Sequence, residues 1–139
     1  MSAKSRASAA LAAASIGGSL LVVGTAPPTV AAVELGTVTY SGTVSCDARY
    51  PAPATSVPVK VTLTNGPKKT PRTASDTVEN DGARAGDYGP TDLVVPLDSK
   101  FQLRVTVSCK PAGQNVKTFN RQIEQTDLTD EQVITLDIK

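Results

Sequence analysis

The chain is 139 residues long, enough for one domain, and its 14 Lys and Arg residues against 13 Asp and Glu residues give a formal net charge of +1. It contains no histidine and no tryptophan. A chain without histidine lacks Ser-His-Asp and Cys-His catalysis and most zinc chemistry. It also carries no phosphate-binding loop or dinucleotide fingerprint. The composition therefore predicts a protein that is not an enzyme and has no cofactor.

The first 32 residues have the pattern of a secretory signal peptide. Lys4 and Arg6 form a basic start, residues 7–23 are an uncharged run rich in Ala, Leu, Ile and Val, and small residues end the segment at Ala31 and Ala32. A membrane anchor is the alternative, but the run is shorter than the roughly 20 apolar residues that a spanning helix needs. We therefore expect cleavage after Ala32 or Ala31, and a secreted, extracellular protein with no membrane partner.

Removal of this segment leaves a nearly neutral mature chain. The loss of Lys4 and Arg6 takes the 14 basic residues to 12, one fewer than the 13 acidic residues. A nucleic-acid-binding domain needs a basic face, and an anionic membrane surface recruits a polybasic patch. The mature sequence has interspersed signs instead, so we expect no nucleic-acid partner and no membrane partner.

The chain has two cysteines, Cys46 and Cys109. An exported chain meets an oxidising environment, in which two cysteines usually pair. We expect a disulfide between them, with two buried free thiols as the alternative. In the chain-entropy model such a bond stabilises the fold by about 4 kcal/mol.

The mature chain begins with the pattern of a strand. Val38, Tyr40, Val44 and Cys46 share one parity, and mostly threonine and serine lie between them. This period of two predicts a strand with one buried face and one solvated face. Gly42 interrupts the alternation and indicates a bulge or a bend.

Three less regular segments follow. Residues 57–63 alternate between aliphatic and polar side chains and end in a turn at Asn65-Gly66-Pro67. Pro58 lies inside this run, so we expect the strand to begin there or to lie at a sheet edge. A weak strand is expected near residues 73–78. Residues 83–90, which are rich in Gly and Pro, are expected to form a loop.

The second half is more regular. Residues 93–97 predict a short strand, and residues 101–109 have the clearest alternation in the chain. Another strand is expected over 116–123, one helical turn over 126–132, and a last strand over 134–138. Six or seven short strands without a long helix predict an all-β fold. We expect residues 33–139 to form a single antiparallel β-sandwich of the immunoglobulin/transthyretin-like kind with one disulfide.

Residues 33–36 directly follow the expected cleavage site and are extended and apolar. They form either the first part of the first strand or a free N-terminal arm that adds to the surface of another protein. For the second case we expect the partner-binding residues to be Val33, Leu35, Val38 and Tyr40.

Two charged clusters are candidates for other sites. Calcium binds to carboxylate oxygens, and carboxylates gather between residues 76 and 92: Asp76, Glu79, Asp81, Asp87 and Asp92. Their spacing matches no familiar calcium loop, and turn chemistry accounts for Asp81-Gly82, so calcium binding by the acidic segment 76–92 stays open. The basic cluster is either a solvated loop or a docking patch for an acidic partner, and it comprises Lys68, Lys69 and Arg72.

Parts of the chain resemble known extracellular families. The segment Ser41-Gly42-Thr43-Val44-Ser45-Cys46, the run over 57–63 and a later Asp-Gly turn look like transthyretin-like, prealbumin-type domains. This resemblance implies a sandwich fold and an extracellular location, and it carries no site. The Ala- and Ser-rich signal peptide looks like those of high-GC actinobacteria. In outline, with an export signal, an arm at Val33-Glu34-Leu35-Gly36 and one immunoglobulin-like domain, the chain is similar to the adaptor subunit of umbrella-shaped secreted toxin particles.

These observations lead to two functional expectations of different kinds. The first is a non-enzymatic secreted protein-binding or adaptor module, which joins another secreted protein by strand addition from its N-terminal arm or an exposed edge. A structural subunit of a secreted toxin complex would be one such module. The alternative is a proteinaceous inhibitor of an extracellular hydrolase that presents a loop within residues 66–90.

Overall fold

The computed structural model describes residues 24–52 and 54–139. The chain divides into two units, Met1–Ala31 and Ala32–Lys139. Of the expected signal peptide, residues 1–23 lie outside the described residues, and residues 24–31 are exposed and belong to no helix or strand. Within the described part of the chain, no helix is long and apolar enough to cross a membrane.

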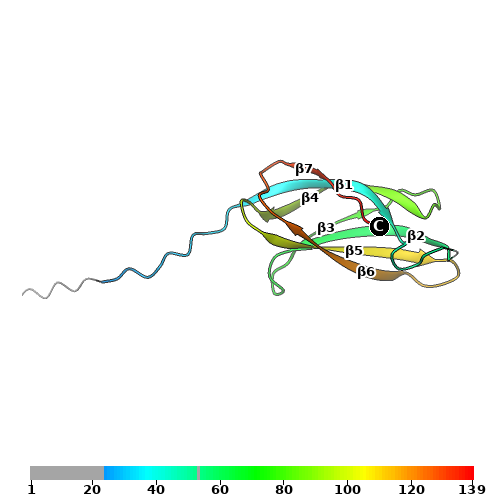
Figure 1. Ribbon diagram of the computed structural model, residues 1–139, viewed down its shortest axis with the longest axis horizontal. Coiled ribbons are helices and arrows are strands. Elements are labelled where there is room, and N and C mark those ends of the chain that lie inside the picture. The colour runs from blue at the N-terminus through cyan, green and yellow to red at the C-terminus, as the bar shows by residue number, and fades with distance from the viewer. Residues whose placement is uncertain (1–23, 53) are drawn as a thin grey trace, which may run out of the picture. The chain divides into compact units, whose positions relative to one another are not determined.

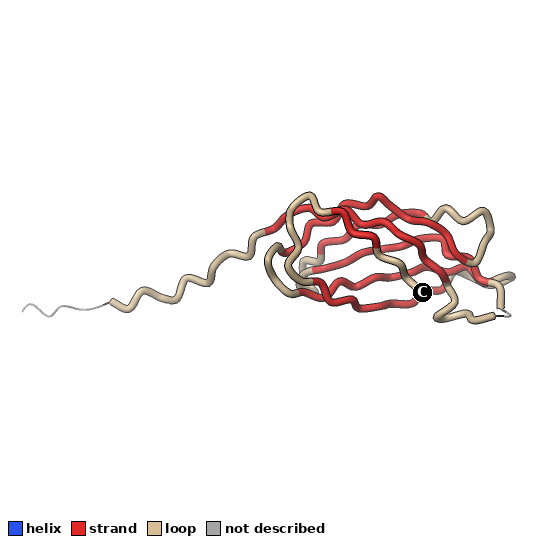
Figure 2. The backbone as a smooth tube through the Cα atoms, turned by 45° about the horizontal axis from the view of Figure 1, so that its top comes forward, coloured by secondary structure: helices blue, strands red, loops and turns tan. Residues whose placement is uncertain are grey.

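The second unit is a sandwich of two β-sheets, which confirms the expected fold class. The strands are β1 (Leu35–Ser45), β2 (Ser56–Asn65), β3 (Arg72–Thr77), β4 (Ala85–Pro96), β5 (Phe101–Pro111), β6 (Lys117–Gln125) and β7 (Val133–Thr135). One sheet has three strands in the order β4-β1-β7, and the other has four in the order β3-β2-β5-β6 (Figure 1). The strands run along the length of the domain, and most loops lie at its two ends (Figure 2).

One strand pair departs from the expected antiparallel arrangement. β1 and β7 are parallel, whereas β1 with β4, β2 with β3, β2 with β5 and β5 with β6 are antiparallel. Residues 126–132 carry the chain from the four-stranded sheet to the three-stranded sheet. After this crossover, β7 runs in the same direction as β1. The crossover residues form turns and bends and no helical turn, so the expectation of a helix here was wrong.

The core lies between the sheets and follows the period of two that the sequence shows. In β5, Leu103, Val105 and Val107 are fully buried, whereas Gln102 and Arg104, which have the opposite parity, are exposed. Each buried aliphatic side chain contributes roughly 1.5–3 kcal/mol relative to an exposed one. Alternation therefore supplies both the strand pattern and most of the stabilising burial.

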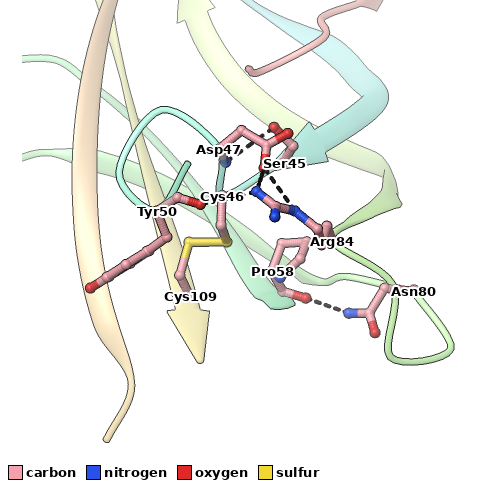
Figure 3. Close-up of a disulfide and its surroundings, with 8 residues drawn as sticks. All are labelled: Ser45, Cys46, Asp47, Tyr50, Pro58, Asn80, Arg84 and Cys109. Carbon is pink, nitrogen blue, oxygen red and sulfur yellow. Dashed lines mark hydrogen bonds and ion pairs between the residues drawn. A yellow bond between two sulfur atoms is a disulfide. The ribbon is translucent and has the colours of Figure 1, made fainter. Parts of the chain in front are cut away.

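The expected disulfide between Cys46 and Cys109 is present, and it joins the two sheets. Cys46 directly follows β1 and Cys109 lies in β5, with 6.1 Å between their Cα atoms and a sequence separation of 63. Both cysteines are at most 1% exposed. Next to the bond, Arg84 pairs with Asp47 and donates to the backbone oxygen of Tyr50, which fixes the loop after Cys46 (Figure 3).

One local expectation was wrong, and another was right only in part. Residues 85–90 belong to β4, although their glycines and proline are typical of a loop, because Gly86 and Gly89 lie so close to neighbouring backbone that a side chain would not fit. Pro58 lies in a central strand, between β3 and β5. It is accommodated there by a register shift between Pro58 and Lys60, and the pairing with β3 begins only at Lys60.

The two long sides of the sandwich differ. On one side β4 and β3 lie next to each other, and the backbone N–H of Gly89 donates to the Asp76 carboxylate at 2.6 Å (Figure 1). On the other side the outermost strands are β7 and β6, which occupy the opposite margins of the view in Figure 1. The first side is closed by contacts between the sheets, and the second is open.

Candidate partner-binding surface

Three of the four residues expected to bind a partner lie in β1, on its two opposite faces, and Val33 precedes the strand. Val38 and Tyr40 point into the core and are fully buried, so they cannot contact a partner while the domain is folded. This corrects the expectation for these two residues. Leu35 and Val33 have the other parity and are 45% and 61% exposed. A strand places alternate residues on opposite faces, so residues of both parities cannot all contact the same partner surface.

Exposed apolar side chains gather with Leu35 on the outer face of the three-stranded sheet. Leu35 lies opposite Pro96, Thr37 opposite Val94, and Thr39 opposite Val133 on its other side. Directly paired residues project to the same face. Val94 is 42% and Val133 is 70% exposed. We call this the apolar face; it consists of Leu35, Val94, Pro96 and Val133.

The outer face of the four-stranded sheet is polar instead. Hydroxyl groups pair across its strands, Thr62 with Ser75 at 3.1 Å and Thr64 with Thr73 at 3.4 Å. Thr106 donates to the amide oxygen of Asn120 at 2.6 Å. A solvated sheet face normally carries such residues. The outer face of the three-stranded sheet also carries polar pairs, Thr39 with Asp92 and Thr43 with Asp87. The apolar face is therefore a patch on that sheet, and it is the part of the outer surface best suited to burial against another molecule.

Part of the expected N-terminal arm over residues 33–36 belongs to β1, and the rest precedes it. Leu35 and Gly36 are paired with Pro96 and Val95 and form the start of β1. Glu34 precedes the strand and accepts a hydrogen bond from the Leu97 N–H through its backbone oxygen at 2.9 Å. Only Val33 lies beyond this last contact. The segment is therefore mainly the first part of strand one, which was the other reading of the sequence.

Three carboxylates of the acidic segment 76–92 accept hydrogen bonds from groups on other strands or loops. Asp76 accepts from the Gly89 N–H, Asp87 accepts from the Thr43 hydroxyl at 3.2 Å, and Asp92 accepts from the Thr39 hydroxyl at 2.6 Å. Within the described residues, no group of three or more metal-ligating side chains is close enough to hold an ion. These carboxylates link neighbouring strands.

The basic cluster lies on and beside the connection between β2 and β3. Lys68 and Lys69 are exposed in residues 66–71, where the Thr70 N–H donates to the Pro67 oxygen at 3.1 Å. Arg72 begins β3 and donates to the side-chain oxygen of Asn65 at 3.3 Å. The two lysines are therefore presented to solvent, whereas the arginine supports the turn.

The titratable groups with the largest perturbation are two core tyrosines. Burial raises the pKa of Tyr40 to about 12. Burial, the charge of Asp137 and the neighbouring Tyr40 raise the pKa of Tyr88 further. Both phenols stay protonated at neutral pH, and both are enclosed in the core, so neither can serve as a base for an external substrate.

Compared with known proteins, the chain matches no family model, no curated protein and no solved structure at a significant level. The geometry itself defines its class. It is an all-β sandwich, with three strands packed on four, a parallel terminal pair and one inter-sheet disulfide.

Proposed function

We propose that the chain is a non-enzymatic, secreted protein-binding module that contacts another secreted protein through the apolar face. The observation that supports this most directly is the exposure of Leu35, Val94 and Val133 on one sheet while the other sheet is polar outside. Exposed apolar side chains that gather on one face are typical of interaction surfaces. Because β1, β4 and β7 hold these side chains on paired strands, binding costs little conformational entropy.

The same features support a binding role over an enzymatic one. The chain has no histidine, and the carboxylates at Asp76, Asp87 and Asp92 accept hydrogen bonds from neighbouring strands. The apolar face offers contact area and no group that activates a nucleophile. A partner would bury this face and pair its own apolar side chains with it.

The test is a capture experiment with matched variants. The mature protein, tagged after Lys139, is incubated with native culture supernatant, and the captured proteins are identified by mass spectrometry. We expect Val94→Lys to abolish capture of a stoichiometric partner, because a lysine there puts a charge into the interface. The control, Thr73→Lys, adds the same charge to the exposed polar sheet and should capture normally. Equal capture by both variants would refute the apolar face as the contact.

A second candidate function, inhibition of an extracellular hydrolase, is favoured by the loop over residues 66–71. It exposes Lys68 and Lys69 between Pro67 and Pro71. Flanking prolines restrict the backbone, and a preorganised loop loses little entropy when it enters an enzyme cleft. Assays of secreted proteases and glycosidases with Lys68→Ala/Lys69→Ala protein separate the candidates. Inhibition that this double variant loses, and that Val94→Lys keeps, would establish the inhibitor.

A further inference from the structure

The unequal number of strands leaves one strand of the larger sheet uncovered. The three-stranded sheet ends at β7, and the four-stranded sheet continues to β6. On the opposite side, β4 and β3 close the sandwich against each other. A fourth strand beyond β7 would cover the inner face of β6. The described residues supply no such strand.

The inner face of β6 shows the effect of this missing cover. Phe119, Arg121 and Ile123 lie opposite Val107, Val105 and Leu103, which are fully buried core residues of β5. They therefore project toward the same side as the core. Yet Phe119 and Ile123 are only half-buried and Arg121 is exposed. Ile134 and Leu136, which have inward parity beside β1, are likewise only half-buried.

The backbone edge of β6 is also without partners. Across the described part of the chain, no backbone group of β6 bonds to anything outside β5 and β6 themselves. The edge of β4 differs, because Asp87 exchanges two hydrogen bonds with Glu79 at 3.0 Å each, and Val94 accepts from the Asn65 side chain at 2.8 Å. Of these two edges, the β4 edge is capped, whereas the β6 edge can pair with an added strand.

A hollow with unpaired positive charge lies along this edge. It has a volume of about 450 Å³ and is lined by Ala48, Arg49 and the β6 residues from Phe119 to Gln122. Both ion pairs of the described residues lie elsewhere, between Arg84 and Asp47 and between Lys100 and Glu124. Arg49 and Arg121 are therefore cations without a carboxylate, and a bound carboxylate would satisfy them.

We infer that β6 accepts an extended segment of the partner protein as a fifth strand of the larger sheet. The segment that fits has apolar side chains at alternate positions, to cover Phe119 and Ile123, and a carboxylate between them that pairs with Arg121 and Arg49. Backbone hydrogen bonds supply the affinity, and the central acidic residue supplies the selectivity. This inference rests on the proposed binding function and names the chemistry of the segment that binds.

The probe is a pair of blocked peptides, TVTETVT and TVTKTVT, titrated into ¹⁵N-labelled mature protein. We expect the glutamate peptide to shift and protect amides of β6 and to bind at least about tenfold more tightly than the lysine peptide. Arg121→Glu should reverse this preference. Lys60→Glu, which makes the same charge change on the outer polar face, should preserve it. Equal affinities, or protection confined to β7 or β4, would overturn the inference.

Two further outcomes separate this inference from its alternatives. Arg121 could act only as a guard against edge-to-edge aggregation, a role that inward-pointing charges commonly have. In that case neither peptide binds, and Arg121→Glu stays monomeric, which would refute the added strand. A concentration-dependent dimer that Arg121→Glu abolishes would make a second copy the occupant and would equally refute it. If the peptide preference fails while Val94→Lys still loses its captured partner, the proposed function stands and only this inference falls.

Discussion

The two tyrosines in the core differ in a single contact, and this difference sets opposite expectations for their removal. The Tyr88 hydroxyl donates to the backbone oxygen of Leu136 at 2.8 Å, which fastens β4 to the C-terminal segment. The Tyr40 hydroxyl is buried and has no partner among the described residues. A buried polar atom without a partner costs roughly 1–3 kcal/mol, whereas a made hydrogen bond contributes roughly 1 kcal/mol.

We therefore predict that Tyr88→Phe lowers the free energy of unfolding by about 1 kcal/mol and that Tyr40→Phe leaves it unchanged or raises it. Both variants remove one oxygen from the same core, so each is the control for the other. Urea denaturation at pH 7 measures the difference. Equal destabilisation by the two substitutions would show that the Tyr40 hydroxyl is satisfied.

The same residues predict how stability depends on pH. In the unfolded chain both phenols ionise near pH 10, whereas the folded pKa of Tyr40 is about 12 and that of Tyr88 is raised further. Above pH 10 the unfolded state therefore binds fewer protons than the folded state, and stability falls as pH rises. A shift of two pH units at Tyr40 corresponds to at most about 3 kcal/mol.

We expect the free energy of unfolding to be insensitive to these groups below pH 9 and to fall between pH 10 and pH 12. Tyr40→Phe should make this fall shallower by the amount that the Tyr40 phenol contributes. Denaturation series at stepped pH, with absorbance at the tyrosinate band as the readout of ionisation, provide the measurement. A wild-type curve that stays flat to pH 12 would contradict the prediction.

Among the elements, β4 depends on a glycine at a crowded position. Gly89 has φ of +88°, and an added Cβ would lie 2.5 Å from the Tyr40 backbone oxygen. Gly82 also has a positive φ, of +80°, but nothing lies within 4 Å of its Cβ position. Both positions strain an alanine, and only the first adds a clash with backbone.

Gly82→Ala should therefore cost about 1 kcal/mol, and Gly89→Ala should cost roughly 3 kcal/mol or more and disturb the β1–β4 register. Thermal unfolding of the two variants compares strain alone with strain plus a clash. Similar melting temperatures would mean that β1 shifts away from Gly89 at little cost.

The start of β1 gives a sharper truncation experiment than removal of residues 33–36 as a block. A chain that begins at Leu35 loses the hydrogen bond between Glu34 and Leu97, and little else. A chain that begins at Thr37 also loses the pairs of Leu35 with Pro96 and Gly36 with Val95, and it uncovers Leu97.

We predict a loss below about 1 kcal/mol for the first truncation and of roughly 2–3 kcal/mol for the second. Denaturation midpoints measure both. If the two truncated chains are equally stable, the first two residues of β1 are not part of the cooperative fold.

Strands with a clear alternation of aliphatic and polar side chains could be predicted from the sequence, even where Gly42 or Pro58 lies inside them. Residues 57–63 and 101–109 were predicted because each side of the strand has one environment, buried or solvated. The first half of β4 was missed because Gly86 and Gly89 are needed for close approach to other segments, which local sequence does not reveal. Sheet order, and with it the bare edge of β6, depends on which distant strands pair.

Part of the candidate surface could be predicted from the sequence. Val33 and Leu35 were predicted and are exposed, whereas Val38 and Tyr40 were grouped with them although parity places them on the other face. The same parity would have found Val94, since Leu93 and Val95 on either side of it point inward. Val133 had no such signal, because β7 is too short to show alternation.

For the molecule as a whole, the closed and open sides predict unequal local stability. β1, β2 and β5 are flanked on both edges, and the β4 edge is capped by Glu79 and Asn65. The β6 edge has no cap. Native-state hydrogen exchange should therefore be slowest in β5 and β1 and fastest among strands in β6 and β7. If β6 were protected as strongly as β4, the description of an open side would be wrong.

The parallel pairing of β1 and β7 has a mechanical consequence. β1 starts at Leu35, and the C-terminal segment runs alongside it in the same direction until Ile138 pairs with Val44. Bonds from Glu131 to Thr37, from Leu136 to Ser41 and from Ile138 to Thr43 span this contact. Tension applied to the two ends of the domain would load these bonds in shear, all at once, instead of unzipping them one after another. A tether built from this domain would resist pulling until all the hydrogen bonds between β1 and the C-terminal segment broke together.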